Sequence, residues 1–337
     1  MNANPRGGRA AAARRTTAIA VAAGLVVAAG LIGNRAASAE AGAVPAKALR
    51  AAPVANPHAG HSVRLSKDQR AAIEAQALAP VRGSEFRANC FSSHRRGDDP
   101  IVKPGQPGAS HIHEFFGNRT TNANSTLQSL SAGTTNCDPE VDLSSYWVPT
   151  LYRNGVAVAP ESVIVYYQGI TDPRNAKPYP RGLKIVVGNA GAANPDQNPS
   201  ARWSCRGYPQ ASRDFVNCPP GSKLETYLDF PTCWDGRSLD SSDHRGHMAF
   251  SPGIGYPCPS THPVAVPRVE FLITYPVNGT GLTLGGTRNG VNVTNAPGYT
   301  FHGDFFNAWP AAALQRRVTN CINAGYICGP DGNPIQQ

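Results

Sequence analysis

Histidine is the residue type in this sequence with the clearest capacity for chemistry. Nine histidines occur in the 337 residues. Seven of them follow residue 83, namely His94, His111, His113, His244, His247, His262 and His302. Because a neutral imidazole binds transition metals and also exchanges protons near neutral pH, these positions are candidates for a metal site or an acid–base site.

The pair His111 and His113 is the sharpest local feature. On a β-strand, residues two apart project from the same face, so both imidazoles could reach one ion. Glu114 would then point to the other face, or support the ligands or act as a base if the strand ends there. Two surface histidines on a loop are the alternative interpretation.

A second cluster lies between Asp240 and His247, where Asp243 and His244 complete a set of two carboxylates and two imidazoles. This composition suits a metal site or an acid–base site. Asp, Ser and Gly also form ordinary solvated turns, and the segment fits that alternative at least as well.

His302 and Asp304 form a third cluster with the same two-residue spacing. Their neighbours are aromatic: Phe301, Phe305, Phe306 and Trp309. A polar pair embedded among aromatic side chains has to be hydrogen-bonded, ionised beside a partner, or bound to something. A buried His–Asp hydrogen bond and a functional site are both compatible with this pattern.

Several familiar mechanisms lack their motifs in this sequence. There is no G-x-S-x-G elbow, no H-E-x-x-H helix, no P-loop and no G-x-G-x-x-G turn. No C-x-x-C pair occurs either, which argues against a structural zinc site made of thiolates.

The elements that must hold these residues are mostly strands. Runs of β-branched and aromatic residues predict strands at Ser162–Tyr167, Leu183–Val187, Val269–Tyr275 and Val291–Thr294. Asn154-Gly155 lies between two apolar stretches and predicts a hairpin turn.

One helix is predicted near the C-terminus. Pro310 would lie in its first turn, Leu314, Val318 and Cys321/Ile322 share one face, and Asn323 and Gly325 would end it. We therefore predict a β-rich domain, mainly antiparallel and sandwich or jelly-roll-like, with long disulfide-stapled loops and one C-terminal helix.

All eight cysteines follow residue 83. An even number of cysteines in an exported chain indicates a disulfide framework. Many connectivities are open, and we take the pairing of sequence neighbours as the prediction: Cys90–Cys137, Cys205–Cys218, Cys233–Cys258 and Cys321–Cys328.

The N-terminal region has the features of an export signal. Four arginines precede an apolar run at Ala18–Ile32, and Ala37-Ser38-Ala39 fits a cleavage site. We predict a signal peptide at 1–39, an Ala/Pro-rich linker with a short helix at 40–83, a single secreted domain at 84–330 and a tail at 331–337. An uncleaved membrane anchor is the alternative, but the run is short and rich in Ala and Gly. The mature protein would then have no stable membrane anchor.

The net charge of +9 is concentrated in this leader and linker. Met1–Gly83 has 11 Lys/Arg and 3 Asp/Glu, a net of +8, and the remainder has 20 and 19, a net of +1. A nucleic-acid-binding protein concentrates positive charge on its folded surface, so this distribution argues against nucleic acid as a partner.

Ordered motifs along the domain resemble those of a known family. They are Asp99–Val102 with Ser110–His113 and Phe116–Asn118; Asp142 with Tyr146–Pro149; Phe230–Gly236 through Asp243, His244 and His247; Cys258-Pro259 with His262, Pro263 and Pro267; and His302–Phe306. The chain resembles the secreted domain-of-unknown-function family number nineteen ninety-six, which is found in fungi and actinobacteria. The resemblance implies an exported, cysteine-rich protein in an extracellular or cell-wall setting, and it implies no established reaction.

Our leading hypothesis is a cleft in which imidazoles bind zinc or copper. Its ligands would be drawn from His111, His113, His244, His247 and His302. Glu114, Asp243 or Asp304 would act as the base if the site is catalytic. An extracellular polysaccharide is the expected substrate, from the family context alone, and we expect a monomer.

Two alternatives remain open at this stage. One is a metal-free glycoside hydrolase that uses two carboxylates from Asp98, Asp99, Glu114, Asp243 and Asp304. The other is a non-catalytic module that binds the cell wall or has a structural role, in which the histidines only make hydrogen bonds.

Overall fold

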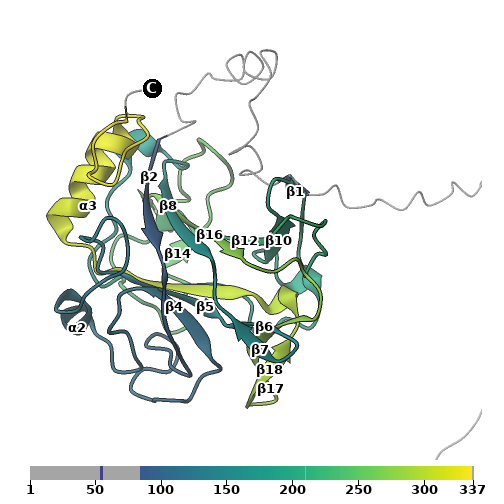
Figure 1. The fold of residues 1–337 in the computed structure, drawn as a ribbon. Helices are drawn as coiled ribbons and strands as arrows, with labels where there is room; N and C mark the ends of the chain where they lie inside the picture. Colours follow the sequence, from purple (N-terminus) through teal and green to yellow (C-terminus); the bar gives the residue numbers. More distant parts are fainter. Residues whose placement is uncertain (1–53, 56–83, 209, 336–337) are drawn as a thin grey trace, which may run out of the picture. The chain divides into compact units, whose positions relative to one another are not determined.

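The architecture is described for residues 54–55, 84–208 and 210–335 of a computed structural model (Figure 1). The predicted signal peptide, the predicted helix after Ser66 and nearly all of the predicted linker lie outside the described residues. None of the helices in the described part of the chain is long and apolar enough to span a bilayer.

A seven-stranded antiparallel sheet has the order β1-β11-β10-β12-β16-β8-β2. Its strands are β1 (Val54–Ala55), β2 (Glu85–Cys90), β8 (Ser162–Gln168), β10 (Arg202–Cys205), β11 (Gln210–Ser212), β12 (Leu224–Asp229) and β16 (Arg268–Tyr275). Two of the four predicted runs form its interior strands β8 and β16, because β-branched side chains fit a sheet surface that is buried, and the other two form strands of the other sheets.

A five-stranded antiparallel sheet has the order β3-β4-β5-β19-β9. Its strands are β3 (Ser92–Arg96), β4 (His113–Gly117), β5 (Ser145–Pro149), β9 (Lys184–Gly188) and β19 (His302–Phe306). Tyr146 on β5 meets Phe271 on β16 edge to face at 5.7 Å. The two large sheets therefore pack face to face and enclose the main core.

Two smaller sheets extend this sandwich. One contains β6 (Leu151–Arg153), β7 (Val156–Val158), β17 (Leu282–Arg288) and β18 (Val291–Ala296), and the other contains β13 (Cys233–Trp234), β14 (Met248–Ala249) and β15 (Val264–Ala265). Asn154 and Gly155 form the two-residue turn between β6 and β7, with φ of 50° and 80°. The predicted hairpin is confirmed, because both positions require the left-handed region that Asn and Gly tolerate best.

Helical structure is limited. Pro310 precedes α3 (Ala311–Arg317), which continues as the π-helix η4 (Val318–Asn323) and buries Leu314, Val318 and Ile322. α2 (Leu127–Ser131) adds one short turn that Thr126 caps. Within the described residues, three 3-10 turns complete the list: η1 (Pro173–Asn175), η2 (Pro195–Gln197) and η3 (Gly298–Thr300). The predicted fold class, with one C-terminal helix, is confirmed.

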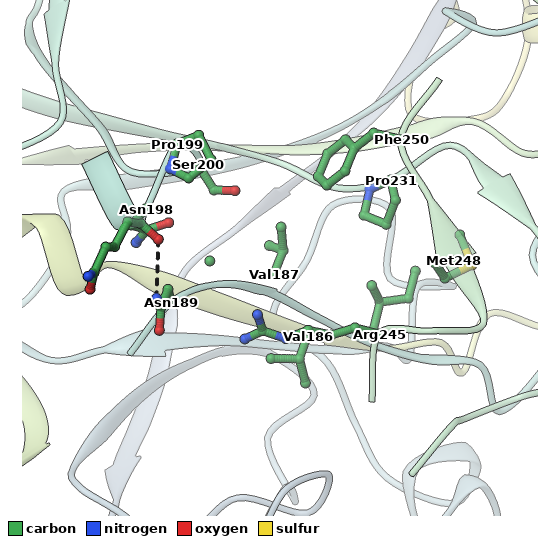
Figure 2. Close-up of a pocket in the computed structure, with 13 residues that line it drawn as sticks. Val186, Val187, Asn189, Asn198, Pro199, Ser200, Pro231, Arg245, Met248 and Phe250 are labelled. Atoms are coloured by element: carbon green, nitrogen blue, oxygen red, sulfur yellow. Dashed lines mark hydrogen bonds between the residues drawn. The ribbon is translucent and has the colours of Figure 1, made fainter. Parts of the chain in front are cut away.

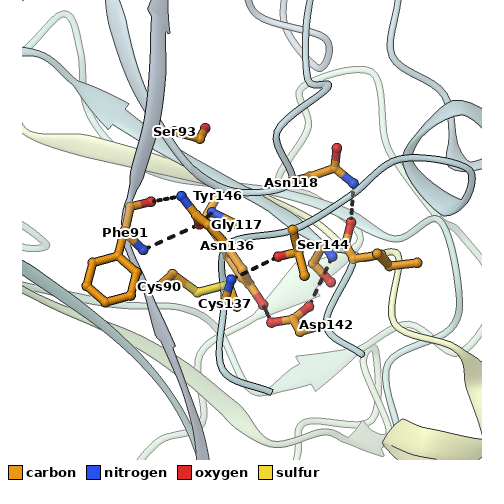
Figure 3. Close-up of a disulfide and its surroundings, with 12 residues drawn as sticks. Cys90, Phe91, Ser93, Gly117, Asn118, Asn136, Cys137, Asp142, Ser144 and Tyr146 are labelled. Atoms are coloured by element: carbon orange, nitrogen blue, oxygen red, sulfur yellow. Dashed lines mark hydrogen bonds between the residues drawn. A yellow bond between two sulfur atoms is a disulfide. The ribbon is translucent and has the colours of Figure 1, made fainter. Parts of the chain in front are cut away.

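The four disulfides join sequence neighbours, as predicted. Figure 3 shows Cys90–Cys137, which ties the end of β2 to the segment that leads into β5. Asn136 strengthens this link, since its amide donates to Phe91 O at 2.9 Å and accepts from Gly117 N at 3.1 Å. Such a framework is typical of proteins that fold in an oxidising compartment.

A buried carboxyl lies beside this disulfide. Tyr146 donates to Asp142 Oδ2 at 2.6 Å, Tyr167 lies 2.6 Å from the Tyr146 hydroxyl, and Trp309 donates to Tyr167 at 3.0 Å (Figure 3 includes Asp142 and Tyr146). Burial raises the pKa of Asp142 to about 6, and these hydrogen bonds offset only part of that effect.

Replacing Asp142 with Asn tests this burial. Because the pKa of Asp142 is raised in the folded state, its proton linkage favours folding at low pH, and this contribution is lost as pH rises through about 6. Between pH 4 and 7 the unfolding free energy of the native chain should fall relative to Asp142→Asn by up to about 3 kcal/mol. Urea unfolding at several pH values measures this, with the exposed Asp196→Asn as control. If the free energy of unfolding changed with pH in the same way in all three proteins, the raised pKa of Asp142 would be contradicted.

Candidate metal centre

The outer face of the five-stranded sheet carries the polar residues of interest. His302 and Asp304 alternate with Gly303 on β19, so both side chains lie on one face. His113 opens β4, which is joined to β19 through β5. This face is also buried, because Phe115, Trp147 and Phe306 form a second apolar cluster there. The predicted strand spacing of His302 and Asp304 is therefore present.

His111 precedes β4 and joins the group from a loop. Its ring centroid lies 4.3 Å from that of His113 and 5.0 Å from that of His302. The His111 and His302 Nε2 atoms are 3.1 Å apart. Close packing fixes the loop, since a Cβ on Gly285 of β17 would lie 2.8 Å from the Ile112 carbonyl oxygen and 3.5 Å from the His111 ring.

Backbone carbonyls orient two of the three imidazoles. His113 Nδ1 donates to Asp98 O at 3.0 Å, and His302 Nδ1 donates to Thr300 O at 2.9 Å. A carbonyl can only accept, so both rings carry the proton on Nδ1 and present an Nε2 lone pair. His111 Nδ1 lies 3.4 Å from the Thr287 hydroxyl. Ligating histidines in metalloproteins are held by the same kind of bond on their other nitrogen.

Two carboxylates complete the arrangement. Donor atoms of His111, His113 and His302 lie within 4.8 Å of one another, and so do those of Asp99, His113 and Asp304. His113 belongs to both groups. Its Nε2 and both oxygens of Asp304 have no hydrogen-bond partner among the described residues, although His113 is 0% and Asp304 1% exposed. Unpaired buried polar atoms are rare, and a bound cation would account for these.

Burial also sets the protonation of the group. Desolvation lowers the pKa of His113 and of His302 to about 4, and desolvation, together with the two adjoining imidazoles, lowers the pKa of His111 further. The same effect raises the pKa of Asp304 well above its usual value and raises that of Asp99. The imidazoles are therefore neutral donors, and the carboxyls ionise only beside a compensating positive charge.

The donor set suits a divalent transition ion. Zinc binds imidazole nitrogen at about 2.0–2.1 Å in tetrahedral sites, which separates its donor atoms by about 3.3 Å. The 3.1 Å between two Nε2 atoms and the 4.8 Å limit of each triad are compatible with that geometry after small side-chain movements. Nitrogen-rich sites with carboxylates also accept copper.

The other residues predicted from the sequence as ligands or bases lie outside the group of three imidazoles. Glu114 points to the opposite face, where it binds Ser92 and Arg95. His247 has both ring nitrogens engaged, with the Ser241 hydroxyl and with Lys184 O. These bonds leave neither residue free to join the three imidazoles.

The loop that contains Asp243 and His244 borders the group without entering it. Asp243 is exposed and accepts from the Arg245 and Gly246 amides, the turn structure weighed as an alternative. His244 bonds Asp240, and its charge also affects the pKa of the buried Asp99. Asp243 and His244 therefore lie beside the candidate site and are not among its ligands.

Two residues of the site were not singled out as ligands from the sequence. Asp99 was weighed only as a carboxylate of a glycosidase pair, because a carboxylate before proline commonly starts a turn. Its Oδ1 does accept from the Ile101 and Val102 amides in such a turn. Asp98 accepts from the Gly108 and Ala123 amides and supplies the carbonyl for His113. The signals available were the proximity of both aspartates to His111 and His113 and the place of Asp99 in the family motif that includes them.

Comparison with known proteins identifies a family, but it provides no characterised example of the site. The sequence profile of a family described as a domain of unknown function, DUF1996, matches residues 99–309, more than half of the chain. The match includes all five members of the two triads. No curated protein and no solved structure is detectably similar to this chain.

The unpaired carboxyl of Asp304 leads us to expect an effect on protein stability. In chelator-treated protein at neutral pH, Asp304→Leu removes two unsatisfied buried oxygens and should raise the free energy of unfolding by about 1–3 kcal/mol. Urea unfolding measures the change. Asp98→Leu is the matched control with the opposite expected sign, because it strands two backbone amides. Destabilisation by both substitutions would show that Asp304 has a stabilising partner in the metal-free protein.

Proposed function

The chain belongs to the DUF1996 family, and we propose that it is an exported domain that binds a transition-metal ion and acts on an extracellular polysaccharide. The ion would be held by the Nε2 atoms of His111, His113 and His302, with Asp304 or Asp99 beside it. The observation that carries this proposal is the set of unpaired buried donor atoms, His113 Nε2 and the Asp304 oxygens, beside two further imidazoles.

Zinc is the first candidate for the ion. Three neutral imidazoles would fill three of the four positions of a tetrahedral zinc ion and leave the fourth for water, and zinc has no geometric preference imposed by its d electrons. Copper(II) favours a tetragonal arrangement, and it remains the alternative because it binds the same donors more strongly in general. Metal analysis distinguishes the two.

A catalytic role would use the carboxylates that face the three imidazoles. A bound ion lowers the pKa of a coordinated water, and a nearby carboxylate can accept its proton. Asp304 and Asp99 are the carboxylates grouped with His113. Of the three bases considered from the sequence, only Asp304 lies there, which makes it the preferred base.

The metal-free hydrolase is less well supported by this geometry. That mechanism needs two carboxylates on either side of a sugar in an accessible groove, about 5 Å or more apart. Asp99 and Asp304 are both buried, and donor atoms of the two lie within 4.8 Å. Such a pair leaves no room for a sugar ring between its members.

Metal content of the purified protein tests the proposal. The native chain should bind about one equivalent of zinc or copper, and His111→Ala and His302→Ala should each lose most of it, since each removes one of three nitrogen donors. Elemental analysis after dialysis gives the ratio. His262→Ala is the matched control, because His262 bonds Thr261 and Gly246 on the surface.

Some variants could lose metal by unfolding, so a change that keeps every donor is also useful. Gly285→Ala should displace the Ile112 carbonyl and His111, and weaken metal binding about 10–100-fold, as loss of support around a ligand does. A competition titration with a chelator measures it. No metal in the native protein, or unchanged content in both histidine variants, would refute the metal centre.

The polysaccharide part of the proposal has its own test. Metal-loaded protein is incubated with a panel of cell-wall glycans, and release of reducing ends is followed before and after chelation. Release that depends on metal and is lost in Asp304→Asn supports hydrolysis. Glycan binding without release would instead favour the wall-binding alternative.

A further inference from the structure

A cavity of about 350 Å³ lies against the strand that borders the metal centre. It is lined by residues of β9, of the 197–200 segment and of the 245–250 segment (Figure 2). Two of the lining residues, Val186 and Gly188, pair in register with Asp304 and His302. The cavity is therefore one strand away from the proposed ligands.

Arg245 brings a positive charge to this cavity. It is exposed, and its guanidinium has no ion pair or hydrogen bond to any described residue. The loop that carries it is fixed, because Val186 N donates to His244 O at 3.3 Å and Asp243 accepts from the Arg245 amide at 3.1 Å. An arginine that is held in a cavity without a partner favours an anionic ligand.

Two other lining residues shape the cavity for a sugar. Phe250 is 55% exposed at the cavity, so its ring face is available for stacking. Asn198 is 0% exposed, and its amide nitrogen is fixed by bonds to Tyr299 O at 2.8 Å and Phe301 O at 2.7 Å. Its Oδ1 has no partner in the described chain. Because this oxygen is enclosed, Asn198 fixes the wall of the cavity through its amide nitrogen and is not itself a ligand contact.

We propose that this cavity binds one acidic sugar of the substrate, either a uronic acid or a sulfated residue. Arg245 binds the anionic group, and Phe250 packs against the sugar ring. This inference rests on the proposed action on a polysaccharide, and it narrows the substrate class to anionic glycans.

Calorimetric titration with matched oligosaccharides tests the subsite. The probes are tetragalacturonic acid, its fully methyl-esterified neutral form, and a sulfated tetrasaccharide. The native protein should bind at least one acidic probe about tenfold or more tightly than the neutral ester, since a charge-assisted pair to arginine contributes that much. Arg245→Gln should lose this preference. Arg237→Gln, which changes an exposed arginine of the same region beside Asp235, should keep it.

Separate readouts distinguish this inference from the metal centre. Thermal unfolding and metal content are measured for each variant, and Arg245→Gln should remain folded and metal-bound. Equal affinity of the native protein for acidic and neutral probes, or equal losses in both arginine variants, overturns the subsite while a bound metal is retained. Acid-selective binding by a protein that contains no metal supports the subsite and refutes the metal centre.

Discussion

The burial of five ionisable side chains, three from one sheet face and two from adjoining loops, is the constraint on which the site depends. Removing charged or polar groups from water is costly unless each finds a partner. Backbone carbonyls satisfy His113 and His302 on one nitrogen, and two backbone amides satisfy one oxygen of Asp99. His113 Nε2 and the Asp304 oxygens have no partner among the described residues, and donor atoms of Asp99, His113 and Asp304 lie within 4.8 Å of one another. A bound cation would satisfy these atoms, whereas a purely hydrogen-bonded core would have paired them with one another.

The five-stranded sheet can hold such a group because both of its faces are covered. Strand periodicity sends Phe305 into the main core while Asp304 faces the imidazoles. Strand periodicity also places neighbours on β4 on opposite faces, since His113 lies in the candidate metal centre whereas Glu114 pairs with Arg95 on the other side. A register slip of one residue would exchange these roles and bury Glu114 among imidazoles, so the aromatic core and the site specify the same register.

Local patterns determined what could be predicted from the sequence. β-branched runs, the Asn154-Gly155 turn and neighbouring cysteines all act over short distances, and the corresponding elements were predicted correctly. The two-residue spacing of His302 and Asp304 indicated a shared face. The proximity of His111 and His302 was a hypothesis drawn from residue types and the family resemblance, and no local pattern could establish it, because long-range register decides which loop covers which strand. Nor did the sequence separate His247 from the ligands, since its bonds to Ser241 and Lys184 exist only in the folded chain.

Electrostatic interactions connect the candidate metal centre with the neighbouring cavity that Arg245 lines. The charge of Arg245 lowers the pKa of Asp304 and opposes protonation of His302, so the guanidinium influences both residues without touching them. An anion bound at Arg245 would cancel part of that positive charge and would make a cation at the imidazoles more favourable. Linkage requires the converse, so a metal ion must strengthen the binding of an anionic sugar by the same factor. The shared strand β9 brings the two sites close together, and because Arg245 is exposed, salt screens part of this coupling.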